Sequence, residues 1–272
     1  MRVIKKSCVF LVIVLATAAV CKTQTLFRLN VLNKHVKPLY RYPTKDELRR
    51  VAPDSDLQAK YREFLKNRET GLTLLVADSG CSENTNVISA RANCIKYSMP
   101  GGGSSYSFRV RNYRIPRLAD ITFTRDSFQA TGILLHGIFV NLGKIPVEEV
   151  GLTTPGLETL RMFRPTVDYY RAKKTDEILS RGFLRNGFAY RRALYIKESD
   201  TFALRSIAYR GKRYRSVAGV TYNELDFDKR RDVIVVFRIV RIAGDGKITL
   251  LWRILQNRKS PKMGSSAKTN AR

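Results

Sequence analysis

The stretch VIVVFRIVRIAGDGKITLLWRIL, residues 233–255, decides the fold of this chain. Two runs rich in β-branched and other apolar residues, 233–242 and 247–255, flank the tripeptide Gly244-Asp245-Gly246. An Asp-Gly turn between such runs is a strong signal for an antiparallel hairpin, because both residues tolerate the positive φ of tight hairpin turns. We therefore expect two paired strands here and a fold built on antiparallel sheet.

Other segments carry strand patterns as well. Apolar and polar residues alternate in 105–111 and in 119–124, which predicts two strands, the first of them with one solvated face. The apolar run 128–142 predicts a central strand that bends at Gly132 or Gly137. We expect further strands at 72–76, 94–99, 188–196, 202–209 and 214–220. Without a β-α-β rhythm or a repeat of fixed period, the pattern favours an antiparallel β-sandwich or a curled sheet.

Three segments predict helices. Residues 44–47 form a capping box at the start of the first helix, which Pro53 ends. The second helix runs over 55–67, where apolar residues recur at helical spacing along one face. A helix inserted among the strands covers 166–181 and ends at Gly182. The fold class is therefore mainly β, with a minor helical part made of two short N-terminal helices and one inserted helix.

The first 21 residues have the order of a secretory signal peptide. A basic segment, residues 1–6, precedes a charge-free run from Cys8 to Cys21 that closes with small residues. A membrane-spanning helix is the rival, but it needs about 20 apolar residues and Lys22 ends the run too early. A bacterial lipoprotein signal is a further alternative, in which Cys21 is lipidated, although Val20 departs from the small residue expected there. We expect export: periplasmic, outer-membrane-associated or secreted.

The remaining chain divides into three parts. An N-terminal arm with the two short helices covers 22–70, a β-rich domain with the inserted helix covers 71–256, and a basic disordered tail covers 257–272. Cys81 and Cys94 predict one disulfide in an oxidising compartment, since a single pair is too few for a structural zinc site and lacks C-x-x-C spacing. No run after the signal is long enough to span a membrane.

Few residues offer familiar catalytic chemistry. The chain has only two histidines, and His136 lies in an apolar run that favours a core position over a catalytic one. Neither H-E-x-x-H nor G-x-S-x-G occurs, and the glycine-rich segment 100–105 lacks the Lys and Ser or Thr of a phosphate loop. We therefore expect no metal and no cofactor, and a non-enzymatic protein is favoured.

The segment 223–228 contains the candidate catalytic carboxylates Glu224, Asp226 and Asp228. In an extended strand these three side chains point to one face, where they could bind calcium or act as general acid and base. Three cations follow directly at 229–231, which favours a structural, ion-paired turn over a site. The spacing also lacks the Gly and terminal Glu of an EF-hand loop.

Charge is the most unusual feature of the composition. Fifty Lys and Arg against 23 Asp and Glu leave +27, and the mature chain keeps about +24 after loss of three N-terminal cations. Such a balance favours a polyanionic partner, although a biased genome composition or a hot habitat also produces it. Basic residues alternate with tyrosines in two clusters, which form one anion-binding surface if their strands are neighbours. These residues are Tyr190, Arg191, Arg192, Tyr209, Arg210, Lys212, Arg213, Tyr214 and Arg215. The alternative is a solvated face with the tyrosines packed beneath it.

Together these features predict an exported, non-enzymatic, β-rich envelope protein that binds an anionic partner. That partner is a lipid headgroup, a cell-wall polymer or an acidic protein, and export disfavours intracellular nucleic acid. One alternative is a hydrolase or lyase that acts on an acidic glycan through the carboxylates of 224–228. Another alternative is a structural subunit of an envelope assembly.

Overall fold

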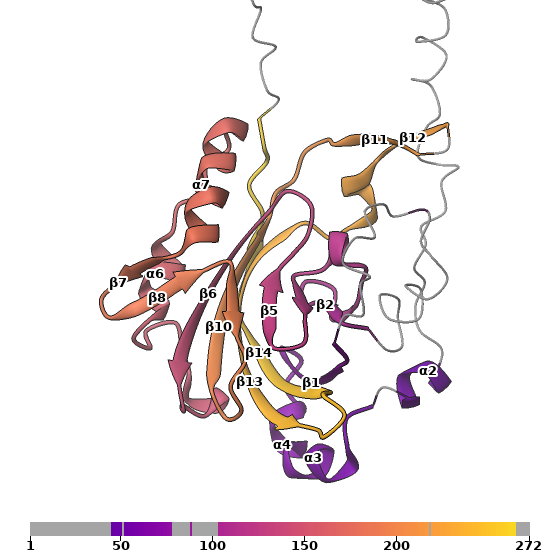
Figure 1. Ribbon diagram of the computed structural model, residues 1–272, viewed down its shortest axis with the longest axis vertical. Helices are drawn as coiled ribbons and strands as arrows, with labels where there is room; N and C mark the ends of the chain where they lie inside the picture. Colours follow the sequence, from indigo (N-terminus) through magenta and orange to yellow (C-terminus); the bar gives the residue numbers. More distant parts are fainter. Residues whose placement is uncertain (1–44, 51, 78–87, 89–102, 218, 265–272) are drawn as a thin grey trace, which may run out of the picture. The chain divides into compact units, whose positions relative to one another are not determined.

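The computed structural model describes residues 45–50, 52–77, 88, 103–217 and 219–264 (Figure 1). These residues fall into two compact units. The described part of the smaller unit is the segment Arg213–Glu224, and the larger unit contains the other described residues. The predicted signal, the arm up to residue 44, the disulfide candidates Cys81 and Cys94, the strand at 94–99 and residues 265–272 lie outside the described residues.

A seven-stranded antiparallel sheet forms the centre of the larger unit, in the order β1-β14-β13-β10-β6-β8-β7. Its longest strands, β13 (Arg231–Ile242) and β14 (Ile248–Lys259), form the predicted hairpin, with Phe237 opposite Trp252. Strand β10 (Thr201–Ala208) pairs with β13 on one side and with β6 (Leu135–Gly143) on the other. The remaining strands are β1 (Thr70–Leu75), β7 (Phe183–Arg185) and β8 (Phe188–Arg191).

A smaller five-stranded sheet, in the order β3-β2-β4-β5-β9, packs on one face of the large sheet. Its strands are β2 (Ser105–Ser107), β3 (Asn112–Tyr113), β4 (Ile121–Phe123), β5 (Ser127–Ala130) and β9 (Ala193–Tyr195). Aromatic side chains of both sheets meet between them: the Phe128 ring lies edge-on to Phe237, and Phe108 lies edge-on to Trp252. The fold is therefore mainly β and consistent with the predicted sandwich.

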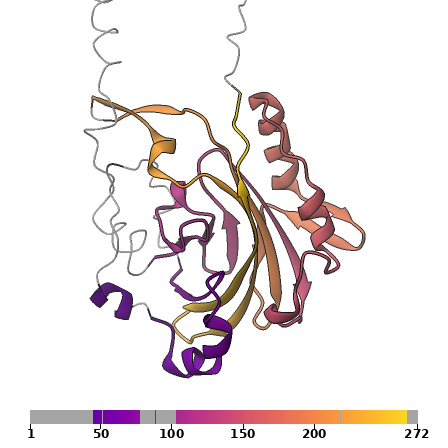
Figure 2. The ribbon, with the colours of Figure 1, turned by 180° about the vertical axis from the view of Figure 1, so that it is seen from behind.

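Helices cover the other face of the large sheet (Figures 1 and 2). Buried side chains of α6 (Leu157–Met162) and α7 (Tyr169–Arg181) pack there with sheet residues such as Ala203 and Val236. Tyr61, Phe64 and Leu65, on or beside α4 (Arg62–Leu65), pack against the same cluster. Short 3-10 turns, η3 (Pro116–Leu118) and η4 (Val147–Glu149), complete the larger unit. None of the helices in the described ranges is long and apolar enough to span a membrane.

The predicted helices occur with shifted ends. The first is α2 (Lys45–Arg50), and the second is divided at Tyr61 into α3 (Ser55–Lys60) and α4. Helix α7 begins at Tyr169, three residues later than predicted, because the Asp168 side chain accepts the amide of Arg171 as an N-cap. The short helix α6 has no counterpart in the prediction.

Three of the predicted strands divide into two elements each. The run 128–142 becomes β5 and β6, which belong to different sheets because the chain breaks at Gly132, whose φ is +107°. The predicted strand 188–196 likewise passes from the large sheet (β8) to the small one (β9). The predicted strand 214–220 divides between β11 (Tyr214–Val217) and β12 (Val220–Asn223), which form a hairpin in the smaller unit.

The solvated face predicted for 105–111 is wrong, and the polar residues of 119–124 are buried as well. Ser107, Arg109, Asp120 and Thr122 are all buried, and an ion pair satisfies the charges of Arg109 and Asp120. The chain also stops being a strand after Ser107 and turns through Arg111, whose φ is +53°. The C-terminal boundary shifts as well: β14 continues to Lys259, so residues 257–259 belong to the sheet and not to a disordered tail.

Candidate functional site

The two basic and aromatic clusters do not lie on neighbouring strands. Tyr190 lies on β8 and Tyr209 directly follows β10, and β6 lies between these two strands. Both tyrosine rings are buried: the Tyr190 hydroxyl donates to the Gly156 carbonyl, and the Tyr209 hydroxyl meets His136 Nδ1 at 3.0 Å. These two rings are therefore part of the core and cannot stack on a ligand.

The cations next to those tyrosines have different surroundings. Arg192 pairs with Asp176 of α7 and donates from Nε to the Ala130 carbonyl. Arg210 donates from Nε to the Ser260 carbonyl at 2.7 Å, and its backbone pairs with Lys262. Arg191 and Lys212 are exposed, and neither has an acidic partner among the described residues. Arg210 thus lies beside the C-terminal segment, whereas Arg191 lies at the edge of the sandwich.

In the smaller unit, the β11–β12 hairpin carries the rest of the predicted cluster. Arg213 and Arg215 approach Glu224 at 3.7 and 3.6 Å. Tyr214 between them exposes 63% of its side chain. Glu224, a predicted catalytic candidate, is therefore an ion-pair partner of the two arginines.

The carboxylate segment is not an extended strand. Residues Glu224–Phe227 form a 3-10 helix, η5, so the alternation that places three carboxylates on one face does not apply. Asp226 is exposed, whereas the Asp228 side chain is fully buried and paired with Arg109 and Arg230. The ion-paired turn, the favoured interpretation of this segment, is confirmed at Asp228 and Arg230.

Asp228 belongs to a buried polar network that sequence reasoning missed. The Asp120 carboxylate accepts Arg109 Nε at 2.7 Å and the hydroxyls of Ser107 and Ser206. Burial opposes the charge on Asp228, but Arg109 and Arg230 outweigh it and hold the pKa of that carboxyl below its usual range. Every charge of this network has a charged partner within the fold, so the network is structural.

A second buried pair, Arg205 with Asp232, forms the floor of an open groove. Arg205 Nε and Nη2 donate to the two Asp232 oxygens at 2.9 and 2.7 Å, and Nη1 donates to the carbonyls of Leu160 and Phe163. The guanidinium therefore joins β10 to β13 and to the end of α6. Because Asp232 uses both oxygens for Arg205, its charge is neutralised at the floor.

The groove has a volume of about 520 Å³ and a strongly basic wall. Its lining residues are Arg161, Met162, Phe163, Arg164, Pro165, Arg205, Asp232, Arg258, Lys259 and Pro261. Four of them, Arg161, Arg164, Arg258 and Lys259, are exposed cations, and none pairs with an acid in the part of the chain that the structure describes. Asp232 is the one acid in the lining. The wall therefore carries a local excess of positive charge that faces solvent.

The register of the sheet explains how the groove assembles. Asp232 lies opposite Arg258, and Ile234 lies opposite both Arg205 and Gln256, so these polar side chains share the face covered by the helices. The C-terminal segment closes the side, where Gly264 donates to the Val167 carbonyl at 2.8 Å. Gln256 is 8% exposed, and neither atom of its amide has a hydrogen-bond partner among the described residues.

Exposed apolar side chains lie in the same segment, 161–170, as two of the groove cations, Arg161 and Arg164. Met162 is 58% exposed and Val167 is 51% exposed, although large apolar side chains are ordinarily buried. Tyr170, at the start of α7, is 60% exposed and contacts the Tyr169 ring. The segment 161–170 therefore presents cations and apolar groups together.

His136 occupies a core position in the described part of the chain. His136 is buried as predicted, with its ring between the Ala172 carbonyl and the Tyr209 hydroxyl, and burial lowers its pKa. The described ranges contain no group of three His, Cys, Asp or Glu side chains that could hold a metal. Cys21, Cys81 and Cys94 lie outside those ranges, so lipidation and the disulfide stay predictions.

Comparison of the chain with protein families, with curated proteins and with solved structures gave no match. A sequence signal for the groove exists in retrospect: the run RMFRP at 161–165 and the run NRK at 257–259 are both rich in cations. Only the register of the sheet, however, brings these two runs to one groove.

Proposed function

We propose that this chain is an exported, non-enzymatic protein that binds an anionic lipid surface through the basic groove. The observation that carries the proposal is the set of four exposed cations around the groove, whose charges no described acid neutralises. Anionic headgroups supply the missing counter-charge, and guanidinium groups bind phosphate in two-pronged geometry.

The exposed apolar side chains favour a lipid surface over a soluble polyanion. Met162 and Val167 lie in the same segment, 161–170, as Arg161 and Arg164. A surface that combines basic and apolar groups suits the boundary between headgroups and acyl chains, where both kinds of contact are satisfied. A soluble polymer makes use of the cations alone.

Export supports the same partner. The basic, apolar and small-residue order of residues 1–21 is typical of a signal peptide, and the mature charge of about +24 attracts anionic surfaces outside the cytoplasm. An intact-mass measurement of the native protein tests this part, because export predicts a chain that begins after the small residues at 16–19.

The binding test compares two variants of equal charge. The groove variant carries Arg161→Gln, Arg164→Gln, Arg258→Gln and Lys259→Gln. The control variant carries Arg125→Gln, Arg181→Gln, Arg185→Gln and Lys144→Gln, four exposed cations outside the groove lining. Sedimentation with phosphatidylglycerol–phosphatidylcholine vesicles at low salt measures the affinity of each variant.

We expect the groove variant to lose most of the binding. Each cation near an anionic surface contributes about 1 kcal/mol, so four contribute about 4 kcal/mol, or roughly a thousandfold in affinity. The control variant loses only the long-range attraction of four charges. Equal losses in the two variants, or a groove variant that binds as well as the unmodified chain, would reject the groove as the site.

A second comparison separates a lipid surface from a soluble polymer. The double variant Met162→Ser, Val167→Ser keeps every cation and removes two exposed apolar side chains. We expect weaker vesicle binding and unchanged binding of soluble polyphosphate. If the double variant keeps both its vesicle binding and its polyphosphate binding, and polyphosphate binds tightly, the groove would be assigned to a soluble polyanion.

A further inference from the structure

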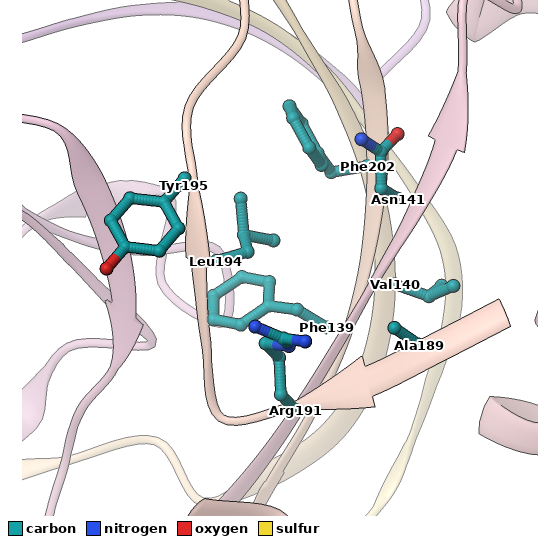
Figure 3. A pocket seen from close by; sticks show the side chains of 8 residues that line it. All are labelled: Phe139, Val140, Asn141, Ala189, Arg191, Leu194, Tyr195 and Phe202. Carbon is teal, nitrogen blue, oxygen red and sulfur yellow. The ribbon is translucent and has the colours of Figure 1, made fainter. Parts of the chain in front are cut away.

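A small cavity opens where the two sheets of the sandwich separate, and it shares no residue with the basic groove (Figure 3). Its volume is about 180 Å³. It is lined by Phe139, Val140, Asn141, Ala189, Arg191, Leu194, Tyr195 and Phe202, which come from β6, β8, β9 and β10.

The strand register explains why space remains there. On the face of the large sheet that points to the small sheet, Phe139 lies opposite Arg191, and Asn141 lies opposite Phe202. The chain leaves β8 at Arg191 and crosses to the small sheet as β9, which pairs with β5 only as far as Tyr195. Ala189, which lines the cavity from β8, contributes only a methyl group to its wall.

The wall of the cavity is held by the fold itself. Arg192, at the crossing between β8 and β9, pairs with Asp176 and donates to the Ala130 carbonyl. Phe139 and Phe202 are fully buried, and Leu194 is 8% exposed, so the floor is apolar and well supported. A site built on paired strands holds its shape better than one built on loops.

Among the described residues that line the cavity, Arg191 is the charged one. Asn141 is committed to its neighbours, since its amide donates to Asp200 and its carbonyl accepts the Gly143 amide. Arg191 is exposed and pairs with no acid in the described part of the chain. Figure 3 shows its side chain rising from β8 toward Phe139 and Leu194. Tyr195 adds a ring at the rim that is 73% exposed.

We propose that this cavity binds a small aromatic carboxylate. An apolar cavity of about 150 Å³ accommodates one benzene ring, so the volume here suits a single ring. The Arg191 guanidinium at the rim forms a two-pronged ion pair with a carboxylate, whereas the accessible parts of Ala189, Leu194 and Tyr195 contact the ring. The ligand class is therefore one ring that carries one carboxylate at a short distance, as in benzoate or phenylacetate.

The test is a titration of the full mature chain, followed by NMR. Benzoate supplies ring and carboxylate, benzyl alcohol supplies the ring, and acetate supplies the carboxylate. We expect benzoate to bind with a Kd of about 1–10 mM, as a ligand of this size does. We expect benzoate to shift the Leu194 methyl signals, and we expect binding at least tenfold weaker for the other two probes.

Variants separate the roles of rim and floor. Arg191→Gln should lower the affinity for benzoate at least tenfold and leave the affinity for benzyl alcohol unchanged. Ala189→Leu should fill the cavity and abolish the binding of both benzoate and benzyl alcohol, although it changes no charge. Arg185→Gln on β7, the matched control, should change neither affinity.

Three results would overturn the proposal. If acetate binds as tightly as benzoate, the carboxylate is bound by the exposed Arg191 alone and the cavity contributes nothing to the affinity. Benzoate binding that survives Ala189→Leu in a chain with a native spectrum would place the ligand elsewhere. An equal loss in Arg185→Gln and Arg191→Gln would show that general surface charge, and not the cavity, attracts the anion.

Discussion

Replacement of Asp228 by Ala tests whether this carboxylate is structural. In the folded chain Asp228 accepts hydrogen bonds from Arg109 Nη1 and Arg230 Nη1, and its side chain is fully inaccessible. Removal leaves two buried guanidinium groups without one of their partners. Loss of one partner from a buried ion pair typically costs 3–5 kcal/mol, because the remaining charge is buried without compensation.

The structure places the expected loss at the lower end of that range. Arg109 keeps Asp120, and Arg230 keeps the carbonyls of Tyr209, Ile133 and Leu134 as acceptors. We therefore expect the free energy of unfolding to fall by about 3 kcal/mol, which is a large part of the 5–15 kcal/mol typical of a domain. The control Asp126→Ala, at an exposed position, should change it by less than about 0.5 kcal/mol.

Urea unfolding followed by tryptophan fluorescence provides the measurement, since the chain has a single tryptophan and Trp252 is buried in the sandwich core. The pH dependence adds a second readout. The pKa of Asp228 is lowered in the folded state, so its contribution is present at neutral pH and is lost as pH falls below the ordinary value of 3.8. A loss below 1 kcal/mol, or one equal to that of Asp126→Ala, would refute the structural role.

Two further predictions concern the core. Gly71→Ala should lower the free energy of unfolding by about 1–3 kcal/mol, because a Cβ at this position would lie 2.1 Å from the Trp252 ring. An unchanged midpoint in urea unfolding would contradict that packing. Burial lowers the pKa of His136, so the unfolded chain takes up a proton at this histidine before the folded chain does, and the free energy of unfolding should fall as pH drops below 6.5. This pH dependence should be weaker in His136→Phe. An identical pH dependence in the variant would contradict a buried, neutral imidazole.

The hairpin and the strand-rich fold class follow from local patterns, and the structure confirms both. The β7–β8 hairpin could also have been predicted: Asn186 and Gly187 have φ values of +49° and +79°, and an Asn-Gly pair favours such a turn. The divided run 128–142 could not, because a continuous apolar run indicates burial without telling which sheet buries each half.

Buried polar residues explain the other errors. Alternation of Ser107 and Arg109 with apolar neighbours predicts a solvated face, but both residues are buried and the Asp120 carboxylate accepts hydrogen bonds from both side chains. The basic groove is a long-range feature as well, since Arg161 and Arg258 meet only through the strand register. The local charge runs therefore predicted an anion-binding surface at residues 190–215. The groove that we propose as the binding site is lined by other residues.

Arginine footprinting with phenylglyoxal tests the proposed lipid-binding groove most directly. The protein is modified with and without phosphatidylglycerol vesicles, and the modified positions are identified by mass spectrometry. We predict that bound vesicles protect Arg161, Arg164 and Arg258, whereas the exposed Arg125 and Arg185 react at the same rate as before. Equal protection of all five arginines, or protection of Arg125 and Arg185 alone, would contradict the proposal that the groove is the binding site.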